Sequence, residues 1–548
     1  MTMNSNLSYA SGASSYPLLG ETIGENLKKA VAKYPQQEAL VSIQQNYRAT
    51  YTEFYSQTEE IAKALIRLGL EKGDRVGIWS PNRAEWTLLQ FATARIGLIL
   101  VNLNPAYREN ELEYVLKQAD IKAVFAAEKF KSSNYKLMLD NVFDKIESLK
   151  YIVIFEDNWK EFLNNAESIS NFKLTSIEQE IQFDDPVNIQ YTSGTTGFPK
   201  GVTLTHHNIL NNGYFIGIRL NYTQKDRVCI PVPFYHCFGM VIGNMACVAH
   251  GACMVIPSES FDPDKTLEAV ELEKCTSLYG VPTMFIAELE LPNFDRYDLS
   301  SLRTGVMAGS PCPIEIMKKV QSKMNMSEVS ICYGMTETSP VSTQTTIGTP
   351  IEKQVSTVGT VQDHLEIKII DPETGAILPR GISGELCTRG YSVMLKYWNN
   401  PEATKAVIDD NNWLHSGDLA TMDVDGYINI TGRIKDIIIR GGENISPKEI
   451  EDFLYTHEAI SDVQVIGVPS EKFGEEVMAW VKVKDGMILT EDELCNYCLQ
   501  IAHFKRPKYW KFVTEFPMTI SGKIRKVEMR EISISELSLE SVKMIKTS

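Results

Sequence analysis

Segments with strand-like and helix-like hydrophobic patterns alternate along the first part of the chain, and this alternation limits the possible folds more than any other feature. The predicted order is strand 75–80, helix 83–99, strand 100–103, helix 110–118 and strand 123–127. Strands that alternate with helices build βαβ units, which place the strands in mostly parallel sheets. The same pattern resumes over 226–331. The sequence therefore predicts an α/β fold with a large N-terminal domain of parallel or mixed sheets.

A further helix is predicted ahead of the first of these strands. Thr52 stands before its first turn, where a hydroxyl can accept a hydrogen bond from the backbone and cap the helix. Apolar residues then recur at helical spacing, namely Phe54, Ile61, Leu65 and Leu68.

The pattern changes twice in the second half of the chain. Residues 358–431 carry short β-type runs between Gly, Asp-Pro and Asp-Gly turn signals, which predict a small, antiparallel-rich subdomain. After Lys435 an α+β pattern of about a hundred residues begins, a length that suits a separate domain. The expected parts are a flexible arm over 1–20, a large domain over 21–434 with its β-rich subdomain at about 355–431, and a small mobile α+β domain over 435–548.

Composition and charge narrow the classes of function. Of the 548 residues, 43% are hydrophobic and 23% are charged, which is typical of a globular protein. The net charge is −16 and the pI about 5.2, so the basic footprint of a nucleic-acid-binding protein is missing. The ten cysteines have no dense spacing, which argues against a disulfide framework and indicates a reducing, cytoplasmic location.

Three local segments were compared with the signatures of other classes of protein. Cys495 and Cys498 form a C-x-x-C inside a predicted helix, 491–502, without a second pair, so we interpret them as ordinary helix residues. Residues 228–258 contain no Lys, Arg, Asp or Glu, but prolines and glycines interrupt them, which favours a loop, a buried helix and a buried strand over a transmembrane helix. The first 16 residues lack Lys and Arg and resemble neither a signal peptide nor a presequence.

The most specific motif is the eleven-residue string YTSGTTGFPKG, residues 191–201, which lies between strand-like runs at 187–191 and 202–204. Its amides and hydroxyls can donate to phosphate oxygens, its glycines permit close approach, and its lysine adds a positive charge. It is not a Walker loop, because the lysine is followed by glycine. The predicted phosphate-binding residues are Thr192, Ser193, Gly194, Thr195, Thr196, Gly197, Phe198, Pro199 and Lys200.

This string resembles the phosphate-loop signature of the adenylate-forming superfamily, which includes acyl-CoA synthetases, luciferases and the adenylation domains of peptide synthetases. Five further signature segments follow in the family's order, so the resemblance covers nearly the whole chain. They are YGMTE at 333–337, HSGD at 415–418, GRIKD at 432–436, RGGENISPKEIE at 440–451 and SGK at 521–523.

The resemblance implies a role for each matched residue in joining a carboxylate to the α-phosphate of ATP. Thr192 and Glu337 would help to hold Mg²⁺, which prefers oxygen ligands. Lys523 would bridge the carboxylate and the phosphate, and Thr336 would contact the α-phosphate. The other nucleotide contacts implied are Tyr333, stacked on adenine, with Gly334 and Met335; Gly309, Ser310 and Pro311 on the adenine and acyl side; and Asp418 and Arg433 at the ribose.

Further residues are implied for the acyl group and for coenzyme A. His236 would lie beside the acyl carboxylate, whereas His206 and His207 are interpreted as structural. Transfer to coenzyme A would follow rotation of the small domain about Lys435. The segment Arg440, Gly441, Gly442 and Glu443 would then line the path of the thiol.

The functional hypothesis is an ATP-dependent fatty acid:CoA ligase that uses ATP, Mg²⁺ and coenzyme A, with a medium-chain acid as substrate. The medium-chain branch is favoured by the resemblance of residues 73–82, 89–97, 104–108 and 234–240. An aryl-CoA ligase is the close alternative, because the floor of the acyl pocket cannot be seen in the sequence. Less favoured are a peptide-synthetase module, a luciferase-like oxygenase and a pseudoenzyme that only binds nucleotide or acyl groups. A monomer or a homodimer is expected.

Overall fold

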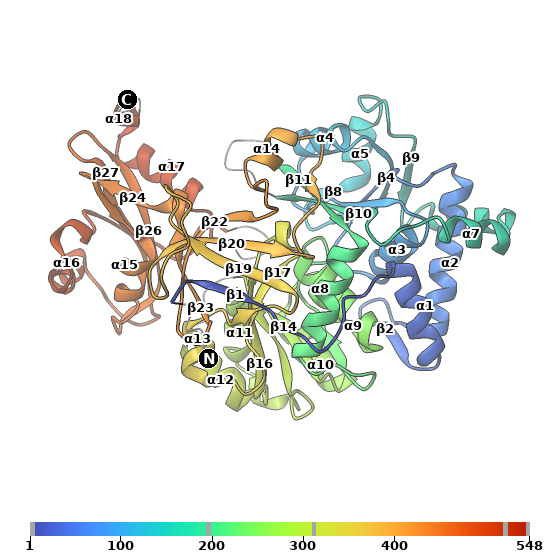
Figure 1. The fold of residues 1–548 in the computed structure, drawn as a ribbon, viewed down its shortest axis with the longest axis horizontal. Helices are drawn as coiled ribbons and strands as arrows, with labels where there is room; N and C mark the ends of the chain where they lie inside the picture. Colours follow the sequence, from blue (N-terminus) through green and yellow to red (C-terminus); the bar gives the residue numbers. More distant parts are fainter. Residues whose placement is uncertain (1–5, 193–198, 310–313, 519–523, 544–548) are drawn as a thin grey trace. The chain divides into compact units, whose positions relative to one another are not determined.

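A computed structural model describes residues 6–192, 199–309, 314–518 and 524–543 (Figure 1). By its packing, the chain divides into two compact units. The main unit comprises Ala10–Ile367 and Thr388–Leu414, and the terminal unit comprises Met1–Tyr9, Lys368–Cys387 and His415–Ser548. The domain boundary expected at 434/435 lies inside the terminal unit, and the mobility expected of the last domain stays a prediction.

Two large sheets form the main unit and confirm the predicted α/β class. The seven-stranded sheet has the order β21 (Lys396–Tyr397), β11 (Lys200–Thr205), β10 (Pro186–Thr192), β5 (Ile99–Asn102), β4 (Arg75–Trp79), β6 (Ile121–Ala126) and β9 (Tyr151–Ile154). The nine-stranded sheet has the order β18 (Thr360–Val361), β17 (Val341–Gln344), β16 (Glu328–Gly334), β15 (Thr304–Ala308), β14 (Ser277–Gly280), β12 (Arg227–Cys229), β13 (Cys253–Ile256), β2 (Glu38–Ser42) and β3 (Tyr47–Thr50).

The central pairs of both sheets are parallel, as the alternating pattern predicts. β4 pairs in parallel with both β5 and β6, and β15 with both β14 and β16. The connecting helices include α3 (Ala84–Arg95), α4 (Glu109–Gln118), α10 (Pro263–Glu273), α11 (Pro282–Leu289) and α12 (Ile314–Lys323). α3 ends four residues before the predicted end at 99, because β5 already begins at Ile99.

The helix expected after Thr52 is α2 (Tyr51–Arg67), but the prediction of Thr52 as its cap is wrong, because the helix already begins at Tyr51. The cap residue is Thr50: its hydroxyl accepts from the Glu53 amide, and the Glu53 carboxylate accepts from the Thr50 amide. This reciprocal capping box satisfies two amides that a cap at Thr52 would leave unbonded. α2 packs against α1 (Ile23–Lys33) and α3 (Figure 1).

The uncharged segment at 228–258 is built as predicted. A loop leads into a π-helix, η2 (Phe238–Met245), which continues as α9 (Ala246–His250) and is followed by β13. η2 and α9 pack against α8 (His206–Arg219). Among the described residues, no helix is long and apolar enough to cross a membrane.

The described part of the N-terminal segment, from residue 6, makes backbone hydrogen bonds, and the flexibility expected of residues 1–20 stays a prediction. β1 (Tyr9–Ser11) leads to Gly12, and within the main unit the Gly12 amide donates to the Leu365 carbonyl at 2.8 Å. Within the terminal unit, the Ser8 amide donates to the Leu378 carbonyl, also at 2.8 Å. The polar composition that indicated flexibility is compatible with an edge strand, because such a strand needs backbone bonds more than buried side chains.

The terminal unit contains an antiparallel pair, β22 (Leu414–Met422) and β23 (Ile428–Arg433), and, further along the chain, an α+β sheet. That sheet has the order β25 (Glu443–Ile445), β24 (Ile438–Arg440), β27 (Gly474–Val483) and β26 (Ile460–Ser470), with β28 (Tyr509–Phe512) paired to β27. Its helices are α15 (Pro447–Leu454), α16 (Glu491–Tyr497), α17 (Lys526–Glu536) and α18 (Glu540–Lys543).

Two details of this sheet concern its helices. Ser446 precedes α15 but makes no side-chain cap bond; its hydroxyl donates to the Thr431 carbonyl at 2.8 Å. Cys495 and Cys498 lie where α16 gives way to a 3₁₀ turn, with Cys495 exposed and Cys498 buried. The nine cysteines that the structure describes are free thiols.

Candidate active site

Three of the predicted site residues follow the carboxyl ends of parallel strands in the nine-stranded sheet. Gly309 comes directly after β15, Tyr333 is the penultimate residue of β16, and His236 lies in the loop after β12. β15 and β16 are neighbours, with Ala308 opposite Cys332. Ligands of open α/β sheets bind beyond this edge, so the fold itself places these residues where a ligand crevice is expected.

The backbone around Tyr333 needs its glycines. A Cβ on Gly334 would lie 1.7 Å from the Pro340 carbonyl oxygen, so no other residue fits there. Gly309 has a φ of +96°, a conformation that side chains rarely adopt. Tyr333 itself is half-buried, which leaves part of its ring surface accessible for stacking.

The phosphate-loop motif is framed by a β-hairpin of β10 and β11. Their last ladder pair places Thr192 opposite Lys200, and the Thr192 hydroxyl lies 3.5 Å from the Lys200 carbonyl oxygen. The predicted residues between them, Ser193 to Phe198, lie outside the described part of the chain, as do Ser310, Pro311 and Lys523. The hairpin therefore fixes the two ends of the loop in one sheet.

Tyr397 connects this hairpin to the predicted metal ligand Glu337. β21 pairs with β11, with Tyr397 opposite Val202. The Tyr397 hydroxyl donates to Glu337 Oε1 at 2.8 Å, and Lys200 Nζ lies 5.1 Å from the centre of the Tyr397 ring. Burial, and secondarily the Glu337 charge, raises the pKa of Tyr397, so the phenol remains a donor. Sequence reasoning missed Tyr397, because it lies far along the chain in a segment without a recognised motif.

The arrangement fits a hard divalent cation. Glu337 sits in the short 3₁₀ turn η4 (Thr336–Thr338), half-buried, with its backbone carbonyl accepting from the Met394 amide at 2.9 Å. Thr192 offers a hydroxyl and Glu337 a carboxylate, and Mg²⁺ prefers oxygen donors of this kind. The main unit thus brings Thr192, Lys200, Thr336 and Glu337 onto connected elements.

His236 begins an unusual stretch of backbone. Its carbonyl accepts from the Met240 amide at 3.0 Å, and its ring centre lies 4.3 Å from that of Tyr235. The π-helix η2 follows at once, and π-helical turns are frequent at functional sites. Buried amides that sequence reasoning missed support this stretch: Gln90 donates to the Met240 carbonyl at 3.3 Å, and Asn102 to the Tyr235 carbonyl at 3.2 Å.

In the terminal unit, Asp418 and Arg433 form an ion pair across β22 and β23. They face each other in the ladder, and Arg433 Nε donates to Asp418 Oδ1 at 3.0 Å. Asp418 is only 5% exposed, whereas half of the Arg433 side chain is exposed. The buried carboxylate is therefore held in place by a cation that itself reaches solvent.

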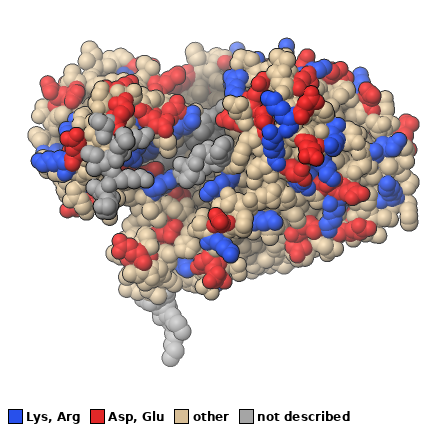
Figure 2. All heavy atoms as spheres, turned by 90° about the horizontal axis from the view of Figure 1, so that it is seen from above, with Lys and Arg blue, Asp and Glu red and all other residues tan. Residues whose placement is uncertain are grey.

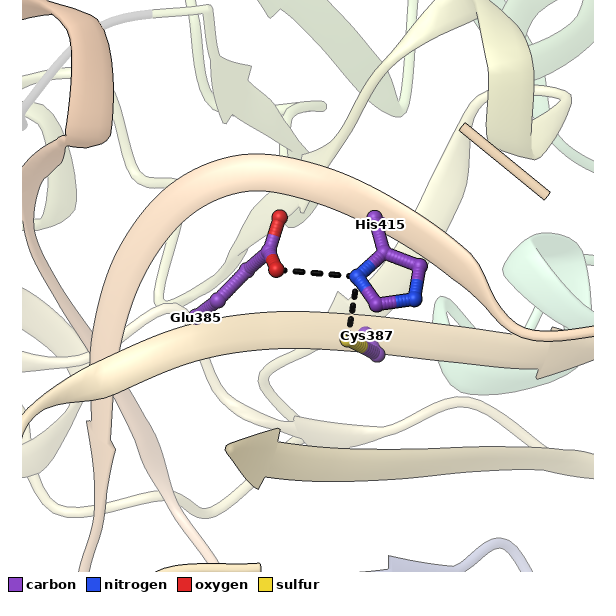
Figure 3. A group of neighbouring side chains, drawn as sticks. All are labelled: Glu385, Cys387 and His415. Carbon is purple, nitrogen blue, oxygen red and sulfur yellow. Dashed lines mark hydrogen bonds and ion pairs between the residues drawn. The ribbon is translucent and has the colours of Figure 1, made fainter. Parts of the chain in front are cut away.

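Close to Asp418 in the sequence, His415 lies in a cluster of three chemically active side chains with Glu385 and Cys387 (Figure 3). Glu385 and Cys387 lie on β20 (Gly384–Gly390), and His415 belongs to the motif HSGD on β22. His415 Nδ1 lies 2.9 Å from Glu385 Oε2 and 3.6 Å from Cys387 Sγ. Only His415 was part of a recognised motif, so no sequence pattern indicated that the other two surround it.

The segment predicted for coenzyme A is a hairpin turn between β24 and β25. Gly441 and Gly442 have φ values of +61° and +90°, which explains why both are glycines. Arg440 pairs with Glu476 at 2.6 Å and stacks on Phe473, so its side chain is largely covered. Glu443 is exposed, and so is Lys435, the expected hinge, in the turn η5 (Ile434–Asp436).

Basic and acidic side chains are interspersed on the face of the molecule in Figure 2, rather than gathered in a basic stripe. This distribution agrees with the net charge of −16. It favours small anionic substrates held by individual cations over a nucleic-acid backbone.

Comparisons with known proteins show the family to which the chain belongs. The family model described as "AMP-binding enzyme" matches residues 27–398, and the one described as "AMP-binding enzyme C-terminal domain" matches residues 449–523. The chain therefore belongs to the AMP-binding enzyme family, the adenylate-forming class that the fold and the motifs define. Within this family it groups with the acyl-CoA synthetases, ligases that use ATP and coenzyme A.

Three similar proteins define the group. YngI of Bacillus subtilis (strain 168), named as a candidate acyl-CoA synthetase, is 47% identical over 96% of this chain and 99% of its own length. The mitochondrial medium-chain acyl-CoA ligase ACSF2 of Danio rerio is 44% identical over 97% of this chain and 91% of its own. The ATP-bound structure of MatB from Rhodopseudomonas palustris superposes with a TM-score of 0.81 at 27% identity, covering 95% of this chain and 100% of that one.

Proposed function

We propose that the protein is an ATP-dependent medium-chain fatty acid:CoA ligase. It adenylates the acid with release of pyrophosphate and then transfers the acyl group to coenzyme A with release of AMP. The observation that carries the adenylation step is the linked set of Thr192, Lys200, Tyr397 and Glu337. This set combines a cation for phosphate oxygens with oxygen donors for Mg²⁺, on three adjacent strands and one short 3₁₀ turn.

The residues divide the chemistry of the first step. Both the acid and ATP are anionic, so the site must neutralise charge while it holds the carboxylate in line with the α-phosphate. Lys200 and Lys523 supply positive charge, Thr336 orients the α-phosphate, and Asp418 accepts from the ribose hydroxyls. Bound Mg²⁺ would neutralise phosphate charge, with Thr192 and Glu337 as its protein ligands.

The second step uses the glycine hairpin. After pyrophosphate leaves, the small domain rotates about Lys435. This rotation brings the segment 440–443 to the acyl-adenylate. Gly441 and Gly442 lack side chains, and an added Cβ on Gly442 would meet nothing within 4 Å. The hairpin therefore leaves room for the pantetheine arm.

The medium-chain assignment rests on the resemblance to ligases named for medium-chain acids. A buried methylene contributes about 0.8 kcal/mol, so two carbons change affinity by roughly tenfold to fifteenfold. Chain-length preference is therefore measurable with a short panel of acids. The free thiols of the described cysteines support a cytoplasmic location.

The test is release of pyrophosphate and AMP across acids from acetate to palmitate, with benzoates included, in the presence and absence of coenzyme A. We expect a maximum at medium-chain acids and steady turnover only with coenzyme A. A maximum with benzoates would replace the proposal by an aryl-CoA ligase. If no acid in the panel caused release of pyrophosphate or AMP although the protein binds nucleotide, the protein would be a pseudoenzyme.

A further inference from the structure

Glu385 is a buried carboxylate of which each oxygen has a partner in residues 415–417, the turn that the positive φ of Gly417 makes within β22. Oε2 lies 2.9 Å from His415 Nδ1, and Oε1 accepts from the Gly417 amide at 3.1 Å. The side chain is 11% exposed, so the two contacts are made largely away from water. Figure 3 shows the carboxylate turned toward the imidazole from the neighbouring strand. One side chain of β20 thus holds two residues of the HSGD motif.

The turn has a third attachment to the same strand. The Ser416 hydroxyl donates to the Leu386 carbonyl at 2.6 Å and accepts from the Asp418 amide at 3.0 Å. Between these contacts Gly417 has a φ of +70°, although an added Cβ would meet no atom within 4 Å. The glycine is therefore required by the backbone conformation of the turn and not by crowding.

Asp418 follows this turn directly. Its amide is bound by Ser416, and its carboxylate accepts from Arg433 at 3.0 Å. The direction of the Asp418 carboxylate is therefore set from two sides, by Arg433 at one end and by the turn at the other. Loss of Glu385 would leave the Gly417 amide and the His415 ring without a bond that the turn now uses.

A metal centre is the competing interpretation of the cluster, because Glu, Cys and His are all ligands of zinc. Their ligand atoms lie within 4.8 Å of one another. However, a hydrogen bond between His415 Nδ1 and a carboxylate requires a proton on that nitrogen, and a protonated nitrogen has no lone pair for a metal. The Gly417 amide also occupies the second Glu385 oxygen. The observed contacts favour a hydrogen-bonded clamp.

We propose that Glu385 is a positioning residue for nucleotide binding: by clamping His415 and Gly417 it aims Asp418 at the ribose. The inference rests on the ribose role of Asp418 under the proposed function. It assigns Glu385 no contact with substrate. Its effect must therefore pass through Asp418, and this is what distinguishes positioning from general stability.

The experiment compares Glu385→Gln, Asp418→Asn and the double variant in the full chain. The readouts are KM for ATP, kcat, and the preference for ATP over 3′-deoxy-ATP. Glu385→Gln should raise KM for ATP roughly tenfold, with kcat within about threefold, because one of two buried charge-assisted bonds is lost. The double variant should have the same KM for ATP as Asp418→Asn alone, because the effects of two residues are not additive when one acts through the other.

Matched controls separate this from folding and from metal binding. Glu366→Gln makes the same change on β19 (Leu365–Ile370), where Glu366 pairs with Arg389, and should leave KM for ATP unchanged. Cys387→Ser should also leave it unchanged. Thermal midpoints and the zinc content of the purified protein are measured for every variant.

Each result decides a separate point. If Asp418→Asn alters ATP binding while Glu385→Gln does not, or if their effects add fully, positioning is overturned and the proposed function stands. If Asp418→Asn itself has no effect on ATP or on 3′-deoxy-ATP preference, the ribose assignment fails and the positioning role fails with it. Stoichiometric zinc that is lost in Cys387→Ser would replace the clamp by a metal centre.

Discussion

The main unit and the terminal unit each contain one carboxylate with a role in the proposed function, Glu337 and Asp418, and the two carboxylates have different surroundings. Glu337 is half-buried, and a neutral phenol, that of Tyr397, donates to it. Asp418 is 5% exposed and is bound by the cation Arg433. A carboxylate whose partner is a neutral donor suits a metal ion, whereas one already paired with a cation suits neutral hydroxyls. The environment, not the residue type, therefore separates their roles.

The largest effect is expected for Glu337→Gln. The amide keeps one acceptor oxygen but loses the charge that would hold Mg²⁺, so kcat for pyrophosphate release should fall about 100-fold or more. A Mg²⁺ titration should show that saturation needs more metal. Glu352→Gln is the matched control, since Glu352 is exposed on α13 (Ile351–Ser356) and lies outside the proposed site. A variant with normal Mg²⁺ dependence would remove the distinction between the two carboxylates.

Asp418→Asn should act on a different parameter. The substitution removes the negative charge that strengthens the hydrogen bonds from the ribose hydroxyls. Such bonds are worth about 1.5–3 kcal/mol, which predicts a rise in KM for ATP of roughly tenfold to a hundredfold. The preference for ATP over 3′-deoxy-ATP should shrink in parallel, while the Mg²⁺ dependence stays as in the parent. Steady-state kinetics with both nucleotides measures this. If kcat fell and KM did not change, the comparison would be wrong for Asp418.

Tyr397→Phe tests the link within the main unit. It keeps the ring beside Lys200 but removes the donor to Glu337, so half-saturation should need about fivefold more Mg²⁺, corresponding to roughly 1 kcal/mol. Binding of Mn²⁺, followed by electron paramagnetic resonance, gives a readout that does not depend on turnover. Tyr47→Phe is the matched control, because it removes a phenol bonded to Gln57 at 2.9 Å. Equal effects of the two variants would deny Tyr397 a specific role.

The smallest effect on activity is expected at His206, whose contribution to stability is lost in acid. Burial lowers the pKa of His206 from 6.5 to about 4, and its Nδ1 accepts from the Ile23 amide at 3.2 Å. The folded state favours the neutral ring, so this stabilisation is complete above pH 6.5 and is lost as the pH falls toward 4. It amounts to at most about 3 kcal/mol.

Chemical denaturation at pH 7 and pH 4.5 checks this expectation. His206→Gln should reduce the difference in unfolding free energy between the two pH values, whereas His503→Gln, at an exposed position, should not. An unchanged difference in His206→Gln would rule out His206 as the source. The measurement separates loss of the fold in acid from loss of activity in acid. Activity that is lost while the fold persists then does not come from His206.

The candidate site residues could be listed from the sequence because the motifs are local. The order of six signature segments indicated Thr192, Glu337 and Asp418, whose roles stay predictions, and hydrophobic periodicity predicted the α/β class with most of the elements of the main unit. Glycines with positive φ, such as Gly309 and Gly442, were visible as fixed positions, although the reason for each lies in the backbone. The position of a helix cap was predicted wrongly where two threonine hydroxyls lie close together in the sequence. Thr50, and not Thr52, caps the start of α2.

The sequence by itself determined the family and the fold class and indicated the residues that are proposed to meet the nucleotide, because those depend on contiguous motifs and on periodicity along the chain. Only the tertiary structure decided which side chains hold these residues in place. Tyr397 reaches Glu337 across 60 positions through the pairing of β21 with β11, and Glu385 reaches His415 across 30 positions from the neighbouring strand. Contacts of this kind depend on strand order and register, and hydrophobic patterns do not specify which distant strands become neighbours.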